Sequence, residues 1–143
     1  HAEGYSTEAS GEKSHAEGEC SIASGVASHA EGYSTEASGE KSHAEGIFAT
    51  ASGVSSHAEG NSTTASGKCS HAEGSNTEAK GKYSHASGFL TQATHSCQYA
   101  VGCGNDPKAD SLFEVGNGLN AEGNLIDDTT TVFDLKTREM HSE

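Results

Sequence analysis

Small and polar residues alternate along this chain in a unit that repeats through residue 102. Counted from a histidine, the unit is H-A-E-G-x-x-T-x-A-S-G-x-x-S, and both halves follow x-Ala-x-Gly-x-x-Ser/Thr. Such alternation is typical of extended strands, whose successive side chains point to opposite faces. Each unit therefore predicts two short strands joined by two tight turns. Glycine at positions 4 and 11 predicts where the chain bends.

The same alternation assigns each position of the unit to a face. With the alanines at positions 2 and 9 pointing inward, the Ser or Thr at positions 7 and 14 and the glycines point inward as well. Histidine at position 1 and glutamate at position 3 then face outward from one strand, and positions 8, 10 and 12 face outward from the other. The predicted interior is a thin slab of methyl and hydroxyl groups.

Histidine recurs with the constant period of the unit, and the segment 1–18 recurs unchanged as 29–46. A short fixed period indicates a solenoid, in which each coil buries its face against its neighbours. We expect an all-β fold of seven coils, roughly 34 Å tall at about 4.8 Å per coil. The histidines in register are His1, His15, His29, His43, His57, His71 and His85.

Large apolar residues are too few to build an ordinary core in this region. Composition alone would predict disorder, because so little apolar surface cannot offset the entropy of ordering. Disorder, however, gives no reason to hold alanine and glycine at a fixed phase. We therefore expect an ordered chain whose missing core is supplied by other copies of itself. Before Phe89 the Ile, Leu, Val, Phe and Met residues are Ile22, Val26, Ile47, Phe48 and Val54.

The residues that replace histidine and glutamate at the end of the repeat predict that these outward positions form a protein interface. The frame continues after Cys97 with Tyr99 in place of histidine and Val101 in place of glutamate. Positions that accept tyrosine and valine suit contact with protein better than contact with water. The residues predicted to contact other copies are His1, Glu3, His15, Glu17, His29, Glu31, His43, Glu45, His57, Glu59, His71, Glu73, His85, Tyr99 and Val101.

Repeats of Ser-x-Ala-x-Gly-x-x-Ser/Thr-x-Ala-x-Gly resemble those in the heads of trimeric autotransporter adhesins. The variant Ser-His-Ala-Glu-Gly-x-x-Thr-x-Ala-Ser-Gly resembles repeats of phage and prophage tail-fibre or appendage proteins. The similarity runs from His1 to about Gly102 and so covers more than two thirds of the chain. It implies a left-handed parallel β-roll that forms a homotrimer through positions 1 and 3. Those positions are usually aliphatic in adhesin heads, so His1 and Glu3 depart from that pattern.

The repeat breaks at Asp106-Pro107, which predicts a β-roll domain at 1–104 and a small β-rich neck or connector domain at 105–143. Strands are expected within 111–118 and 129–135. The segment A-D-S-L-F-E-V-G-N-G resembles the part of tail-fibre proteins that joins such rolls to a coiled coil or a self-cleaving chaperone. Larger apolar residues gather here: Leu112, Phe113, Val115, Leu119, Leu125, Ile126, Val132, Phe133 and Leu135.

Charge and composition limit the classes of partner that we expect. The formal net charge is −13 without a basic patch, so we expect no nucleic-acid partner. We also expect no membrane insertion, since no apolar run is long enough and no signal peptide is present. Because the chain opens on His1 without methionine, we expect a fragment of a longer protein. Cys69 and Cys97 lie two coils apart, roughly 10 Å, which predicts free thiols.

Histidines stacked at this spacing, each with a glutamate two residues on, suggest a metal site when three chains bring their imidazoles together. The alternative, which we favour, is that each imidazole donates to a glutamate of a neighbouring chain or packs against its equivalents above and below, with no cofactor. Such histidines would titrate between about pH 5 and 8, in a direction that the sequence leaves open. No copy of the motif is distinguished as a catalytic site, so we expect no enzyme. Ice binding is not favoured, because the threonines at position 7 are predicted to point inward.

These observations predict a structural, receptor-contacting rod of a phage tail fibre or appendage, which attaches to a bacterial surface receptor. Its expected location is the virion tail, the cell surface or the extracellular space. One alternative is the head of a cell-surface trimeric adhesin, which neighbouring sequence would distinguish by a membrane anchor. The second alternative is a metal-binding, histidine-lined rod. Candidate receptor contacts are Tyr5, Tyr33, Ile47, Phe48 and Phe89.

Overall fold

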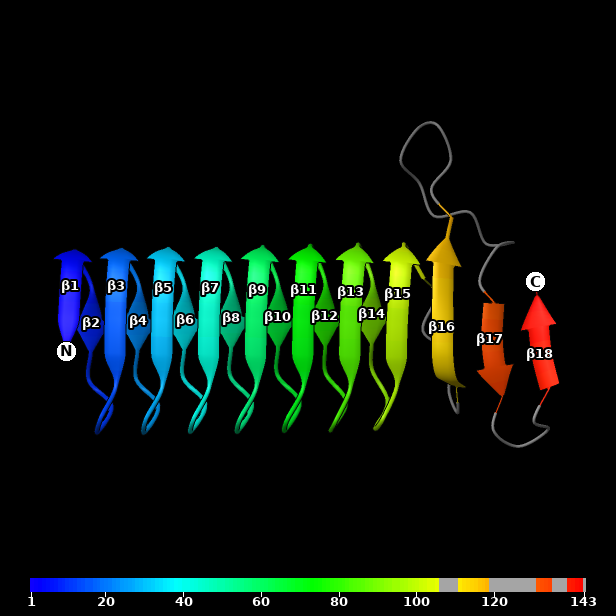
Figure 1. Ribbon diagram of the computed structural model, residues 1–143, viewed down its shortest axis with the longest axis horizontal. Helices are drawn as coiled ribbons and strands as arrows, with labels where there is room; N and C mark the ends of the chain where they lie inside the picture. Colours follow the sequence, from blue (N-terminus) through cyan, green and yellow to red (C-terminus); the bar gives the residue numbers. More distant parts are fainter. Residues whose placement is uncertain (106–110, 119–130, 135–138, 143) are drawn as a thin grey trace.

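The protein is a parallel β-solenoid of about eight 14-residue coils, seen in a computed structural model that describes residues 1–105, 111–118, 131–134 and 139–142 (Figure 1). The prediction of an all-β solenoid is confirmed, and none of these residues is helical. The expected number of seven coils was one too few. Tyr99–Cys103 adds a further strand although its first residue is tyrosine instead of histidine.

Two sheets form the sides of the rod. The long-strand sheet has 11 strands in sequence order along the rod, and the short-strand sheet, seen behind it in Figure 1, has 7. Strands of the long-strand sheet are β1 (Ala2–Tyr5), β3 (His15–Glu19), β5 (His29–Tyr33), β7 (His43–Ile47), β9 (His57–Asn61), β11 (His71–Ser75), β13 (His85–Phe89), β15 (Tyr99–Cys103), β16 (Ser111–Asn117), β17 (Thr131–Asp134) and β18 (Glu139–Ser142). Strands of the short-strand sheet are β2 (Glu8–Ala9), β4 (Ile22–Ala23), β6 (Glu36–Ala37), β8 (Thr50–Ala51), β10 (Thr64–Ala65), β12 (Glu78–Ala79) and β14 (Gln92–Ala93).

Coils stack in register, so each position of the repeat forms a column that runs along the rod. His29 pairs with His43 in the parallel ladder, and Ala30 pairs with Ala44. The same offset of one unit holds in the short-strand sheet, where Ala37 pairs with Ala51. Because the register is constant, chemistry at one position of the unit is repeated at every level of the rod.

Alanine is the sole hydrophobic residue in the buried core of the described chain. All 14 buried alanines are fully inaccessible to solvent, and they come from the columns at positions 2 and 9 plus Ala49. The inward direction predicted for positions 7 and 14 is also confirmed. Ser28 donates its hydroxyl to the carbonyl of Gly25 at 2.7 Å, and Thr35 donates to Ser21 at 2.9 Å. These inward hydroxyls find partners inside the slab, whereas those of Thr63 and Thr77 have none among the described residues.

The inward direction predicted for the glycines is confirmed at position 11 and wrong at position 4. Gly18, at position 4, is exposed instead of inward-facing, while Gly25, at position 11, is buried. A Cβ atom added to Gly18 would lie 2.2 Å from the carbonyl oxygen of Gly32, and one added to Gly25 would lie 2.0 Å from that of Gly39. Both distances are far below contact, so glycine is required because the next coil occupies the space.

The tight bends occur two residues after each glycine, at positions 6 and 13. Fourteen non-glycine residues there adopt left-handed backbone conformations, for example Cys20 with φ 57° and Ala27 with φ 56°. This conformation disfavours side chains, and no corner carries a β-branched residue. From the second coil on, each corner is held by the preceding coil. The main-chain N–H of Cys20 donates to the carbonyl of Tyr5 at 2.8 Å, and that of Ala27 donates to the carbonyl of Glu12 at 2.7 Å.

The C-terminal strands extend the long-strand sheet. Strand β16 pairs in parallel with β15 at the unchanged offset of one unit, Tyr99 opposite Phe113, and β17 and β18 follow as antiparallel neighbours. The expected strands within 111–118 and 129–135 are therefore confirmed, whereas β18 was not predicted. The division into two domains stays a prediction. Outside the described residues lie Asp106, Pro107, Leu119, Leu125, Ile126 and Leu135.

Buried amide side chains close the end of the short-strand sheet. The N–H groups of Thr94 and His95 donate to Oε1 of Gln98 at 2.7 and 3.0 Å. In earlier coils the equivalent N–H groups donate to a carbonyl of the next coil, as Ser24 and Gly25 do to Ala37. Gln98 therefore supplies the acceptor that the main chain supplies elsewhere.

Glu114 ends the inner alanine column. It lies opposite Ala100, is fully buried, and accepts hydrogen bonds from the Ser111 hydroxyl and from Nδ2 of Asn105. Gln98 Nε2 donates to the same serine at 2.6 Å. A polar cluster thus replaces the methyl core at this level, and we call Gln98, Asn105, Ser111 and Glu114 the polar cap.

All four cysteines are free, as expected, with Cys20, Cys69 and Cys97 exposed and Cys103 partly buried. Among the described residues, none belongs to a helix long and apolar enough to cross a membrane.

Candidate functional site: the histidine–glutamate face

The histidine and glutamate columns lie side by side on the outer face of the long-strand sheet. Both flank the alanine at position 2, as His29 and Glu31 flank the buried Ala30, so alternation places them on the opposite side of the sheet. The side chains of His29 and Glu31 remain 38% and 34% exposed. A single chain therefore covers this face only in part, and the predicted role of these residues as an interface between copies stays a prediction.

The imidazole rings stack along the rod. Ring centroids of His29 and His43 are 4.7 Å apart with planes 1° from parallel, and those of His43 and His57 are 4.8 Å apart at 2°. Toward the two ends the rings tilt, with 33° between His15 and His29 and 47° between His71 and His85. The spacing is that of the strands themselves, so the β-ladder sets the distance between rings.

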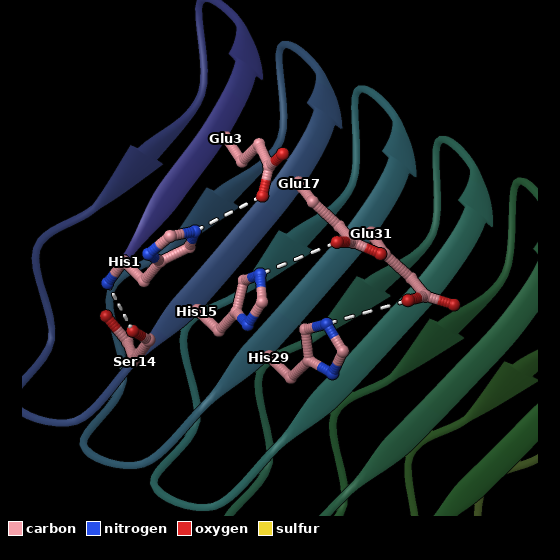
Figure 2. A network of polar contacts seen from close by, with 7 residues as sticks. All are labelled: His1, Glu3, Ser14, His15, Glu17, His29 and Glu31. Atoms are coloured by element: carbon pink, nitrogen blue, oxygen red, sulfur yellow. Dashed lines mark hydrogen bonds and ion pairs between the residues drawn. The ribbon is translucent and has the colours of Figure 1, made fainter.

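Five of the seven histidines place Nε2 within 3.6 Å of a carboxylate oxygen in the glutamate column: His1, His15, His29, His57 and His85. Figure 2 shows the pattern at the N-terminal end, where His15 Nε2 lies 3.5 Å from Glu17 and His29 Nε2 lies 3.5 Å from Glu31. Farther along, the partner shifts to the preceding coil, and His85 Nε2 lies 3.3 Å from Glu73. The expected packing of the imidazoles against their equivalents is thus confirmed, whereas donation to a glutamate of a neighbouring chain stays a prediction.

Most of these contacts are too long or poorly aligned to be hydrogen bonds. The Nε2 atoms of five successive histidines are shielded from solvent and have no hydrogen-bond partner within the described chain. Buried polar atoms in native proteins are nearly always paired, so a repeated exception calls for a partner. The five are His15, His29, His43, His57 and His71.

Burial lowers the pKa of His43 and His71 from the usual value of histidine. Loss of hydration is the largest cause for both, and the neighbouring imidazoles above and below lower the pKa further. Nearby carboxylates, such as Glu45 beside His43, oppose the shift without cancelling it. These two imidazoles therefore favour the neutral form, whose free nitrogen lone pair can bind a metal ion.

A shallow groove of about 820 Å³ follows the glutamate column. The position 4 glycines form its floor, since they carry no side chain to fill the space beside the carboxylates. Its lining residues are Glu3, Gly4, Glu17, Gly18, Glu31, Gly32, Glu45, Gly46, Glu59, Gly60 and Gly74.

Both columns become apolar toward the C-terminus. Tyr99 follows His85 in the ring stack at 4.6 Å, and Phe113 follows Tyr99 at 5.7 Å. Val101 and Val115 continue the glutamate column at the same levels. Sequence reasoning found Tyr99 and Val101 but missed Phe113 and Val115, although both lie one further unit of the repeat along the chain.

The five candidate receptor contacts are all exposed, between 40% for Phe89 and 72% for Tyr5. Three of them come together at one edge of the rod. Tyr33 and Phe48 meet edge to face at 5.4 Å, and Ile47 pairs with Tyr33 in the ladder. Tyr5 and Phe89 belong to β1 and β13, far along the rod from this cluster.

No protein-family model matches the chain, and no curated protein matches it in sequence. Its function therefore has to be argued from the fold and from the histidine–glutamate face.

Proposed function

We propose that this chain is a structural, receptor-contacting rod of a phage tail fibre or appendage, built as a homotrimer. In this arrangement the coils are left-handed, three histidine–glutamate faces meet around a common axis, and the segment after residue 104 forms a neck. The protein acts on the virion tail or at a cell surface, where it attaches to a bacterial receptor.

One observation carries the proposal: the histidine–glutamate face is half-covered in a single chain and becomes apolar at one end. Tyr99 and Phe113 are 38% and 40% exposed, although they continue a stack of partly buried rings. Apolar side chains aligned with unpaired imidazoles suit burial against another chain. A core made only of alanine also leaves a lone chain with little apolar burial, which association would increase.

The trimer is tested by measuring mass at low protein concentration with native mass spectrometry and sedimentation equilibrium. We expect three chains per particle. Val101→Asp buries a charge in the proposed interface and should lower the mass toward one chain. Val54→Asp, on an exposed edge of the coil with 42% of the residue accessible, is the matched control and should leave the trimer intact. A well-folded wild-type monomer would overturn the proposal.

Attachment is tested separately, by binding of fluorescently labelled protein to washed bacterial cells. Replacement of the exposed cluster by Tyr33→Ser and Phe48→Ser should reduce binding, whereas Tyr83→Ser, on an exposed corner away from it, should not. Equal binding by all variants would remove these residues from the receptor contact. The adhesin alternative shares the rod and the trimer, and a membrane anchor in the same protein would favour it.

A further inference from the structure

The histidine–glutamate face contains two groups of three potential metal ligands that do not overlap. In each group two imidazoles from adjacent coils and the carboxylate between them place their ligand atoms within 4.8 Å of one another. The first group is His29, Glu31 and His43, and the second is His57, Glu59 and His71. Two imidazoles with one carboxylate form a donor set that binds zinc in other proteins, with a fourth position left open.

An independent observation covers these four imidazoles and also His15. The Nε2 atoms of His29, His43, His57 and His71 are shielded from water and have no hydrogen-bond partner among the described residues. Leaving such an atom unpaired costs free energy, and a metal ion bound to its lone pair would remove that cost.

We propose that each group binds one divalent transition-metal ion, with zinc as the best match, so that one chain holds two ions. All three ligands of a site come from the same chain, and the inference therefore does not rest on the trimer. It changes the interpretation favoured from sequence alone, because the unpaired nitrogens distinguish the central levels of the column from its ends.

Binding requires a small movement of the rings. Two nitrogens on one tetrahedral zinc ion lie about 3.4 Å apart, given zinc–nitrogen bonds of about 2.0–2.1 Å. The rings of His29 and His43 stack parallel at 4.7 Å, so they must tilt toward each other. Adjacent rings elsewhere in the column already tilt by 33° and 47° on the same backbone spacing. The β-ladder therefore tolerates the motion.

Charge also favours a cation. Glutamates line the groove beside the imidazoles, and the chain carries a formal charge of −13. A divalent ion would bind two imidazole nitrogens and offset the charge of the carboxylate between them.

The test is calorimetric titration of the EDTA-treated full chain with zinc chloride. Wild type should bind two zinc ions per chain. The triple variant His15→Ala/His43→Ala/His71→Ala leaves no two histidines on adjacent coils and should bind zinc at least about tenfold more weakly. The matched control His1→Ala/His15→Ala/His85→Ala also removes three imidazoles but keeps both groups, and should retain two ions.

A second pair of variants tests the carboxylates without removing a ring. Glu31→Gln/Glu59→Gln should weaken binding by about tenfold or more, whereas Glu3→Gln/Glu17→Gln, in the same column outside both groups, should not. Far-UV circular dichroism verifies that every variant is folded. If the alternating histidine variant does not fold, the glutamate pair decides the question.

Absence of zinc binding by wild type overturns the inference, as does equal binding by the alternating variant and its control. The second result would mean that isolated imidazoles bind zinc wherever they occur. Mass measured on the same samples keeps the two proposals separate. A monomer that binds two zinc ions would refute the trimer alone, and a trimer that binds none would refute the metal sites alone.

Discussion

The side chain of Asn105 pairs with the main chain of Gln92 as a neighbouring strand would. The N–H of Gln92 donates to Asn105 Oδ1 at 2.6 Å, and Asn105 Nδ2 donates back to the carbonyl of Gln92 at 2.9 Å. Exposed strand edges invite pairing with other chains. The polar cap therefore ends the short-strand sheet by occupying its last donors and acceptors.

Removing one member of the polar cap should loosen this end of the rod. Gln98→Ala leaves the N–H groups of Thr94 and His95 without an acceptor, at a cost of about 1–3 kcal/mol. Hydrogen–deuterium exchange should accelerate at residues 92–95 and stay unchanged near the N-terminus. Gln92→Ala is the control, since its main chain makes the contact, and unchanged exchange in Gln98→Ala would contradict this account.

A single methyl group at a stacking glycine should destabilise the rod. In Gly25→Ala the new Cβ would lie 2.0 Å from the carbonyl oxygen of Gly39, so the coils must separate locally. We expect a loss of about 2–4 kcal/mol, measured as a lower urea midpoint. Ser24→Ala, on the exposed neighbouring residue, should change the midpoint little.

The opposite substitution two residues later should stabilise the same coil. Ala27 holds φ 56°, a conformation that costs an alanine about 1–2 kcal/mol and glycine almost nothing. Part of the gain is lost because glycine makes the unfolded chain more flexible. Ala27→Gly should therefore raise the melting temperature slightly, and Ala27→Val should lower it. A decrease with glycine would show that the corner is not strained.

Acid should destabilise the metal-free protein. The pKa of His43 and His71 is lower in the folded chain than in the unfolded chain, so the unfolded chain binds more protons below about pH 6.5. The stability contributed by these neutral imidazoles is present above that pH and is lost as pH falls through it. With EDTA present, the melting temperature should decrease from pH 7 to pH 5, and His43→Gln/His71→Gln should flatten the decrease. A melting temperature that is constant or rises toward acid would contradict the sign.

The fold is well predicted from the sequence because two independent patterns, the fixed period and the strand alternation, indicate the same β-solenoid. The period gives the coil, and alternation gives the inward alanines, serines and threonines, all of which the structure confirms. The outward histidine–glutamate face follows from the same rule. Local pattern suffices here because each coil contacts only its neighbours.

Other features depend on distances between coils, which no linear pattern records. Glycine at position 11 predicted a bend, whereas the close approach of Gly39 to Gly25 explains it. Gln98 and Asn105 depart from the repeat in sequence. Only the hydrogen bonds show that their side chains take the place of main-chain groups of a further coil. Unpaired imidazole nitrogens likewise require knowledge of which atoms solvent reaches.

The constant register of the coils also affects how the length of the rod can change during evolution. A coil meets the next coil through the same contacts by which it meets the previous one, so adding or removing one whole unit leaves all other contacts unchanged. The segments 1–18 and 29–46 are identical, and recombination between such stretches inserts or deletes whole units. Because these segments start two units apart, the length of the rod can change in steps of about 9.6 Å, while the fold itself stays the same.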